Sequence, residues 1–408
     1  MISGYIYSKF LNIFGKDINN CRFLNYFCGI MDKVAVVILN WNGRKFLRKY
    51  LPALVANTPC TMAGGNVSII VADNGSTDGS MGFLEKEYPQ IRRIPLERNY
   101  GFTGGYNRAM AQVEAEYFIL LNSDILVPRN WLEPLVSFMD THPQAGICQP
   151  KMLSEGKHQE LCMEATGEKD LTGGFVPQRG KEGELSGGKH ETFEYAGACG
   201  GYMDVLGFPF CRGRVLSSVE EDNGQYDDAA RVFWASGACM VVRSCVWREL
   251  GGLDEAFFAH MEEIDFCWRA QLAGYQVWAV PQSHVFHVGG GTLPNNSPRK
   301  LFFNYRNNLL MLYKNLPVGE GWEAFGFRNG NRSLYIFLRM CVDWLTAIIY
   351  LLQLKWSFFT SVFKAHRDFF RMKRNAAITL PDNRRNLPYG IWPKSMLVSR
   401  LLGRPVRF

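Results

Sequence analysis

The sequence predicts an α/β fold in which a mostly parallel sheet is flanked by helices. From residue 34 onward, apolar segments of strand length alternate with amphipathic segments of helix length. The segment 117–121 is apolar throughout and is bounded by turn residues. Strands that are apolar on both faces are typical of a parallel sheet covered by helices on both sides, and alternating strands and helices are joined by right-handed crossovers.

Each element of this region is predicted from its own pattern. The strands are rich in β-branched and aliphatic residues, whereas the helices have apolar residues at helical spacing. The expected strands are 34–39, 67–72, 91–96 and 117–121, and the helices between them are 45–56, 78–87 and 104–115. After a break in the pattern we expect a strand at 232–242, a helix at 262–273 and a strand at 277–280.

The chain of 408 residues divides into regions of different composition. Residues 1–30 are expected to be an N-terminal arm or an over-extended gene start, since they lack the ordered parts of a signal peptide. A catalytic domain is expected at 31–317, with an insertion at about 155–231 that is Gly-rich, polar and too long for an ordinary connection. Residues 318–408 are expected to form an amphipathic helical region and a basic tail.

Charge and cysteine content favour a cytoplasmic protein at a membrane surface. Much of the net charge of +7 lies near the C-terminus beside apolar sequence, which favours anionic lipid and gives no reason to expect a nucleic-acid partner. The 11 cysteines are an odd number without metal-ligand spacing, so we expect reduced cysteines. The predicted location is therefore the inner face of the cytoplasmic membrane.

The segment 334–363 is rich in Leu, Ile, Phe and Trp. Three charged residues, Arg339, Asp343 and Lys355, interrupt it and leave roughly fifteen uncharged residues where a membrane span needs about twenty. We predict one or two amphipathic helices that lie in the membrane interface. A buried helical hairpin that covers the catalytic domain is the alternative.

Polar residues follow three of the predicted strands directly. Asn40 and Trp41 follow the first strand, Asp73 follows the second, and Asn122 and Asp124 follow the fourth. The carboxyl ends of parallel strands share one edge of the sheet, where open α/β folds bind ligands. Each of these residues, taken alone, is also compatible with a turn or a helix cap.

Two later segments add candidate binding groups. The Gly-rich segment 98–107, with Asn99, Gly104 and Asn107, opens a helix whose backbone N–H groups can face an anion.

The second segment contains Glu262, Glu263 and Asp265 at the start of a helix, and His287 follows one strand later. Adjacent acids often only stabilise a helix start, and a lone histidine is more often structural. Together with Asp124, these groups would suit a hard divalent cation that is bound partly through substrate phosphates.

In this order the motifs resemble those of family 2 glycosyltransferases with the GT-A fold, particularly the rhamnosyltransferase-like enzymes that build bacterial surface polysaccharides. The resemblance runs from about residue 34 to about residue 317. It implies that Asn40, Trp41 and Asp73 bind the nucleotide, with Trp41 on the base. It also implies that Asn122 occupies the first position of the Asp-x-Asp motif on the donor side.

The resemblance assigns roles to the other candidates. The loop with Asn99, Gly104 and Asn107 lines the donor pocket. The expected ligands of Mn²⁺ or Mg²⁺ are Asp124 and His287. The expected catalytic base is Glu263, with Glu262 as the alternative, because this chain has Glu-Glu where relatives often have Glu-Asp.

The implied activity is transfer of a sugar from a UDP- or dTDP-linked donor to a hydroxyl of a glycan or lipid-linked glycan. One carboxylate base without a covalent nucleophile implies inversion. The insertion segment 193–210 and the region around Trp234 are expected to shape the acceptor site.

Two alternatives remain open. A sugar-nucleotide nucleotidyltransferase would need a Gly-rich phosphate loop after the first strand, where this chain has only Gly43. A catalytically decayed, membrane-tethered scaffold would account for Asn122 and for the Glu-Glu pair.

Overall fold

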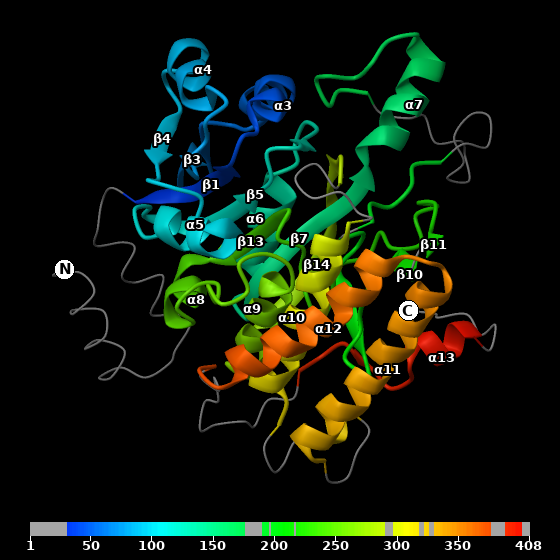
Figure 1. The fold of residues 1–408 in the computed structure, drawn as a ribbon. Helices are drawn as coiled ribbons and strands as arrows, with labels where there is room; N and C mark the ends of the chain where they lie inside the picture. Colours follow the sequence, from blue (N-terminus) through cyan, green and yellow to red (C-terminus); the bar gives the residue numbers. More distant parts are fainter. Residues whose placement is uncertain are drawn as a thin grey trace, which may run out of the picture.

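The computed structural model describes residues 31–175, 190–195, 197–215, 218–289, 297–317, 322–325, 330–376 and 388–401. The predicted N-terminal arm and the last residues of the basic tail lie outside this set. Figure 1 shows the N-terminal elements at the top and the C-terminal helices at the bottom.

A large mixed sheet forms the centre of the molecule. Its strand order is β12-β14-β7-β13-β5-β1-β3-β2, with β4 paired to β3 and β6 paired to β14. The strands are β1 (Asp32–Asn40), β2 (Thr61–Met62), β3 (Gly65–Asp73), β4 (Arg92–Pro95), β5 (Ala115–Leu121), β6 (Ile125–Leu126), β7 (Ala145–Ser154), β12 (Ala230–Arg231), β13 (Cys239–Arg243) and β14 (Gln276–His287).

The core of this sheet is parallel, which confirms the predicted fold class. β4, β3, β1 and β5 are neighbouring parallel strands. β13 runs antiparallel to both β5 and β7, whereas β14 runs parallel to β7. Because β13 reverses direction between two strands that point the same way, the carboxyl ends of β5, β7 and β14 lie at the same edge.

Helices cover both faces of the sheet. The helices are α3 (Arg44–Asn57), α4 (Ser80–Glu87), α5 (Gly101–Met110), α6 (Glu133–Thr141), α7 (Glu155–Thr166), α8 (Ser244–Glu249), α9 (Glu262–Leu272), α10 (Pro298–Asn315), α11 (Arg332–Leu352), α12 (Trp356–Lys373) and α13 (Met396–Leu401), with a short 3₁₀ turn at Trp322–Phe325. Alternate residues of β1 enter two separate buried clusters, one with α3, α4 and α6 and the other with α5, α8, α9 and α10. This two-sided burial explains why the strands are apolar throughout.

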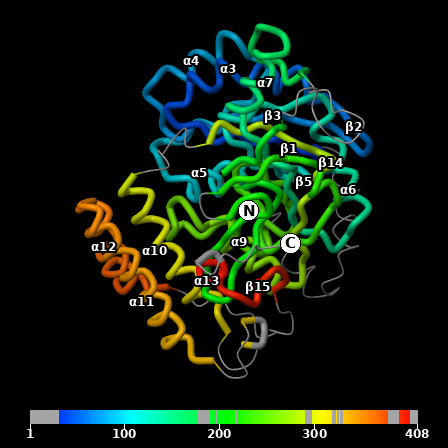
Figure 2. Tube along the Cα trace, turned by 90° about the vertical axis from the view of Figure 1, so that its right-hand side faces the viewer, coloured from blue at the N-terminus to red at the C-terminus, as the bar shows by residue number. Residues whose placement is uncertain are grey.

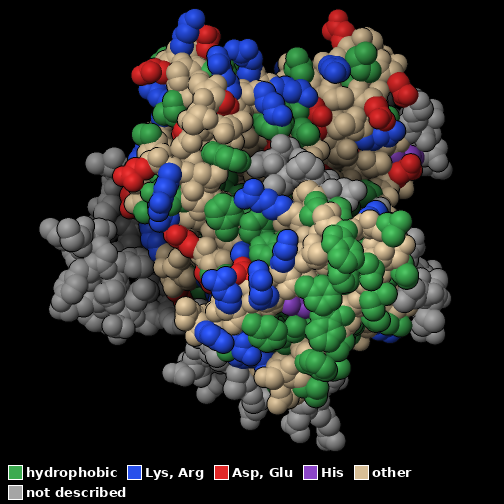
Figure 3. All heavy atoms as spheres, in the orientation of Figure 1, with side chains coloured by type: hydrophobic (Ala, Val, Ile, Leu, Met, Phe, Trp, Pro, Cys, Tyr) green, Lys and Arg blue, Asp and Glu red, His purple; other side chains and the backbone are tan. Residues whose placement is uncertain are grey.

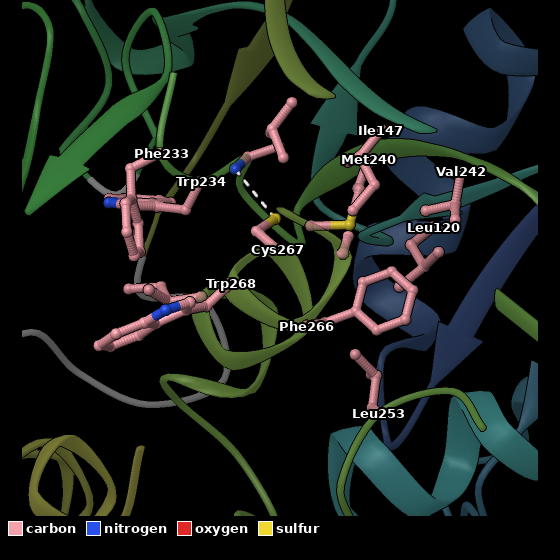
Figure 4. Close-up of a cluster of buried hydrophobic side chains, with 14 of the residues drawn as sticks. Leu120, Ile147, Phe233, Trp234, Met240, Val242, Leu253, Phe266, Cys267 and Trp268 are labelled. Atoms are coloured by element: carbon pink, nitrogen blue, oxygen red, sulfur yellow. Dashed lines mark hydrogen bonds between the residues drawn. The ribbon is translucent and has the colours of Figure 1, made fainter. Parts of the chain in front are cut away.

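The strand predicted at 232–242 is too long, because β13 begins only at Cys239. In the preceding segment, Ala235 N donates to Cys267 Sγ and Ser236 N donates to Gln149 Oε1. These backbone groups bond to side chains rather than to a neighbouring strand. Figure 4 shows the contact with Cys267 among the aromatic side chains that pack α9 against the sheet.

The insertion contains its own small sheet. Its order is β11-β10-β9-β8-β15. The strands are β8 (Gly201–Asp204), β9 (Pro209–Cys211), β10 (Arg214–Val215), β11 (Ser218–Val219) and β15 (Ile391–Trp392). Since β15 comes from the C-terminal region and runs parallel to β8, the tail and the insertion are joined in one sheet.

The C-terminal region is helical, as the sequence predicts. Helices α10, α11 and α12 lie side by side along one side of the molecule (Figure 2). α10 also contacts α9, the helix that carries the acidic motif. The C-terminal helices are therefore connected through α10 to the helix that carries the acidic motif.

Candidate functional site

The structure places the predicted polar residues at one edge of the large sheet. Asn40 and Asp73 are paired residues at the ends of β1 and β3. β5 ends one residue before Asn122, and Asn122 N donates to Ala238 O at 2.8 Å, just before β13 begins. β14 ends at His287, which pairs with Ile125 of β6.

Asp124 and His287 are in direct contact at this edge. His287 Nε2 lies 3.3 Å from Asp124 Oδ1, and both side chains are buried. On the other side of the ring, His287 Nδ1 lies 3.4 Å from Glu194 Oε1. Burial alone would lower the pKa of His287, but the carboxylates of Glu194 and Asp124 raise it to about 10. The ring thus lies between two carboxylates, which favour its protonated form.

Glu194 is a site residue that the sequence did not single out. It belongs to the insertion, and its backbone N donates to Met152 O of β7 at 3.0 Å. No motif marks it within the Gly-rich, polar insertion. The nearest sequence prediction is that segment 193–210 shapes the acceptor site, whereas Glu194 lies beside His287.

Asp73 lies in a network of hydrogen bonds at the ends of β1 and β3. Asn40 Nδ2 donates to Asp73 Oδ1 at 2.9 Å and to Ser76 Oγ at 3.1 Å, and Ser76 N donates to Asp73 Oδ2 at 3.0 Å. Asn40 therefore orients Asp73. Trp41 follows directly and its side chain is 45% exposed, so its ring is open to a flat ligand at this edge.

Asn74, which sequence analysis also missed, shapes the Gly-rich loop. Its Nδ2 donates to Gly101 O at 2.9 Å, and its Oδ1 accepts from Tyr100 N at 2.9 Å. Asn99 Oδ1 accepts from Gly101 N at 2.8 Å. The side chain of Asn99 thus fixes the turn from which α5 starts.

The start of α5 contacts the acidic-motif loop. Phe102 N donates to Phe258 O at 2.8 Å, so one of the first amides of this helix already has a protein acceptor. α5 begins at Gly101, earlier than predicted, and a Cβ on Gly101 would lie 2.5 Å from the Phe258 ring. Gly104 is also tightly packed, since a Cβ there would lie 3.0 Å from Tyr100 Cβ.

Asn107 ties the same helix to the segment before the acidic motif. Its Nδ2 donates to Leu253 O at 2.7 Å, and its Oδ1 accepts from Leu253 N at 3.0 Å. These bonds give Asn107 a structural role, and its predicted contact with the donor stays a prediction.

The three acids at the start of α9 have different environments. Asp265 forms an ion pair with Arg269 at 2.7 Å and accepts from Asn315 Nδ2 at 2.7 Å, so it anchors α9 to α10. Within the described residues, neither Glu262 Oε2 nor Glu263 Oε2 has a hydrogen-bond partner. Burial raises the pKa of both carboxyl groups, that of Glu263 to about 7.

Glu263 is linked to the Asn122–Asp124 corner through Gly237 and Ala238. A Cβ on Gly237 would be 3.6 Å from Glu263 Cβ, and the next residue, Ala238, accepts the hydrogen bond from Asn122 N. Lys300 at the start of α10 interacts electrostatically with both Glu194 and Glu263. The acidic motif is thus brought to the edge that carries Asp124 and His287.

The residues of this edge fit a divalent cation that is only partly held by protein. Asp124 and His287 offer a carboxylate oxygen and an imidazole nitrogen 3.3 Å apart, a spacing compatible with two ligands of one ion. In the described part of the chain, no group of three or more His, Cys, Asp or Glu side chains is arranged to hold a metal ion. Further ligands would have to come from substrate oxygens, as is usual for Mg²⁺-type sites.

Comparison with known proteins agrees with these motifs. The family model described as "Glycosyl transferase family 2" matches residues 35–192. N-acetylglucosaminyl-diphospho-decaprenol L-rhamnosyltransferase from Mycobacterium tuberculosis is 26% identical over 268 residues, which cover 63% of this chain and 76% of that protein. Rhamnosyltransferase WbbL from Escherichia coli is 37% identical over 62 residues, 15% of this chain and 23% of that protein.

One similar solved structure is the mannosyltransferase PcManGT from Pyrobaculum calidifontis, determined in complex with GDP-Man and Mn²⁺. Its TM-score is 0.46 and its sequence identity is 11%. The match covers 86% of this chain and 95% of that chain. The family match covers the ends of β1, β3 and β5 and the Gly-rich loop, and stops before the acidic motif. Residues 35–192 therefore match the family 2 glycosyltransferases, and the motifs at the ends of β1, β3 and β5 lie within that match.

Proposed function

We propose that this enzyme transfers a sugar, with inversion and with the help of Mn²⁺ or Mg²⁺, from a UDP- or dTDP-linked donor to a hydroxyl of a lipid-linked glycan. The observation that carries the proposal is the convergence of Asp124, His287 and Glu263 at one sheet edge. The relative from Mycobacterium tuberculosis is named for a lipid-linked acceptor, and we extend only that class of acceptor to this chain.

The chain's own groups suit a single displacement. The acceptor hydroxyl oxygen attacks the anomeric carbon, its proton moves to a carboxylate, and the bond from that carbon to the diphosphate breaks. A bound divalent cation would supply Lewis-acid stabilisation of the departing diphosphate.

Glu263 is our candidate for the base. Its raised pKa, near neutrality, allows it to be ionised before attack and still to hold a proton afterwards. Glu262 is more deeply buried than Glu263, and burial also raises its pKa well above the ordinary value.

The test is a donor panel in which release of nucleoside diphosphate is measured with Mn²⁺ or Mg²⁺ and a lipid-linked acceptor. We expect Glu263→Gln to lower turnover by about 10²–10⁴-fold while nucleotide binding is nearly kept, since general-base catalysis contributes that much. Glu262→Gln should lower turnover less.

Asp124→Asn should weaken the metal dependence of donor binding, and His287→Ala should act similarly but less strongly.

The outcomes separate the competing activities. Wild-type turnover in Glu263→Gln would exclude this residue as the base. Release of pyrophosphate from a nucleoside triphosphate and a sugar phosphate would indicate a nucleotidyltransferase. A protein that binds donors but never turns over would indicate a decayed scaffold.

We also propose that α11 and α12 attach the enzyme to the cytoplasmic membrane at its inner face. Among the described residues, Arg332–Leu352 is the one helix long and apolar enough to cross a membrane, and one third of its apolar window is buried. Apolar side chains gather over this region in Figure 3, and we call them the apolar face. The apolar face consists of Leu334, Phe337, Leu338, Leu345, Ile348, Ile349, Leu351, Leu352, Leu354, Trp356, Phe363 and Phe370.

The two charged residues within the apolar part of α11 point away from this face. Arg339 and Asp343 are buried and paired with each other, and Asp343 Oδ2 lies 3.1 Å from His366 Nε2 of α12. Exposed basic residues flank the apolar face, namely Lys355, Lys364, Arg367, Arg371 and Arg374. An apolar face beside a basic stretch is typical of helices that lie on an anionic bilayer.

A further inference from the structure

We infer that Glu194 is a positioning residue, which holds the His287 ring so that Nε2 faces Asp124. The inference rests on the metal role proposed above for Asp124 and His287. It assigns part of the donor site to the insertion, which the family match covers only as far as residue 192.

The ring of His287 lies between two carboxylates from different parts of the fold. Its Nε2 is 3.3 Å from Asp124 Oδ1, and its Nδ1 is 3.4 Å from Glu194 Oε1. The second separation is longer than a well-formed hydrogen bond, so we describe the contact as an ion pair. Among the described residues, Nδ1 is buried and has no hydrogen-bond partner, which leaves Glu194 as the acidic group that this nitrogen faces.

Glu194 is fixed in the place where it can act on the ring. Its side chain is 4% exposed, its backbone N bonds to Met152 O, and the preceding Phe193 forms an isolated bridge with Leu153 of β7. The carboxylate also faces the positive charges of Lys300 and Arg214. The insertion is thus attached to the sheet immediately beside this carboxylate.

The chain after His287 leaves room for this carboxylate. Gly289 has a φ of +68°, and a Cβ there would lie 2.8 Å from Glu194 Oε1. A larger residue at this position would both strain the backbone and push the carboxylate aside. Gly289, just after β14, therefore allows the Glu194 carboxylate to lie close to the end of this strand.

The chemical reason for such an arrangement is general. A histidine that binds a metal through one ring nitrogen usually donates the other N–H to a carboxylate or carbonyl, which fixes the tautomer and the ring orientation. Loss of that outer partner typically costs 10–100-fold in metal affinity. Glu194 is placed to be that partner.

The first experiment measures Mn²⁺ binding directly, by electron paramagnetic resonance of free Mn²⁺ in the presence of UDP or dTDP and without a sugar acceptor. We expect Glu194→Gln to weaken Mn²⁺ binding by about 10–100-fold. Glu194→Asp, which keeps the charge, should recover part of the affinity.

Glu191→Gln is the matched control. Glu191 belongs to the same part of the insertion, is also buried and lies 2.8 Å from a different histidine, His158. We expect it to leave Mn²⁺ affinity unchanged. Unchanged affinity in Glu194→Gln, or an equal loss in Glu191→Gln, would overturn the inference.

The second experiment does not depend on a metal. ¹⁵N chemical shifts of the histidine ring nitrogens, with His287 assigned through His287→Gln, should change at Nδ1 in folded Glu194→Gln and stay unchanged in Glu191→Gln. If the wild type binds no Mn²⁺, the metal part of the proposed function fails and these shifts alone decide the role of Glu194. Identical His287 shifts in the wild type and in Glu194→Gln would refute it.

Discussion

At the scale of single residues, the site consists of side chains whose roles depend on neighbours that the sequence does not reveal. Asp265 and Glu263 are two residues apart on one helix, yet Asp265 is fully paired and Glu263 has a buried oxygen without a hydrogen-bond partner among the described residues. The motif predicts that carboxylates gather here. Only the position of Arg269 and Asn315 in space tells which one is structural.

The raised pKa of Glu263 predicts the pH dependence of the activity. Burial raises this pKa from its ordinary value of 4.5 to about 7, and a base must be ionised to accept a proton. We expect kcat/KM to rise with pH and to level off above about pH 7, with an acid limb of one proton. A profile that is flat between pH 5 and pH 8 would contradict the assignment.

The same residue should lower the stability of the wild type at high pH. The folded state binds more protons than the unfolded state between the two pKa values, so stability falls as pH rises through this window and stays low above pH 7. Glu263→Gln removes this cost. Urea unfolding should show Glu263→Gln to be more stable than the wild type at pH 8, on the order of 1–3 kcal/mol, with a smaller difference at pH 5.

At the scale of elements, the sequence predicts most strands and helices between residues 34 and 121 well, because their patterns are strong and their connections short, but it does not predict α6, β7 or α7. It predicts β14 poorly, placing a strand at 277–280 where the structure has Gln276–His287. The pairing of β14 with β7 is irregular between Val280 and His284, which interrupts the apolar alternation that marks a strand. Beyond this irregularity β14 continues to His287. The same irregularity therefore makes the strand hard to predict and positions His287 at its end.

The contact between α5 and the acidic-motif loop gives a prediction at this scale. Gly101→Ala would place a Cβ 2.5 Å from the Phe258 ring at a φ of +75°, so we expect a loss of at least about 1 kcal/mol in the free energy of unfolding. Gly82→Ala in α4, where a Cβ meets nothing within 4 Å, is the control and should stabilise the protein by up to about 1 kcal/mol. Equal effects in urea denaturation would show that the contact does not form.

At the scale of the whole molecule, the two buried charges of α11 leave its exposed apolar surface uninterrupted, whereas the sequence alone suggests that they interrupt it. As a linear pattern, Arg339 and Asp343 interrupt an apolar segment. In the fold both are buried, and the apolar face is exposed. The membrane interface, one of the two predictions for this region, is favoured over a buried hairpin because so much apolar surface would otherwise face water.

Vesicle flotation tests this attachment. The wild-type protein should float with vesicles that contain anionic lipid and less with zwitterionic ones, and added salt should weaken binding through the basic residues. The double change Ile348→Glu and Ile349→Glu should abolish flotation without unfolding the protein, since both side chains are about half exposed. Leu171→Glu, equally exposed in the insertion, is the control and should float normally. Flotation of the double variant would contradict the assignment of this face.

The proposed function depends most on one spatial arrangement, in which Asp124 and His287 would hold a metal ion beside Glu263. Anomalous diffraction from crystals grown with Mn²⁺ and with UDP or dTDP locates that ion directly. We predict a peak within ligand distance, about 2.1 Å, of an Asp124 carboxylate oxygen and of His287 Nε2, with the nucleotide diphosphate on its other side. A nucleotide bound at another face of the sheet, or a Mn²⁺ peak that touches neither side chain, would contradict the account.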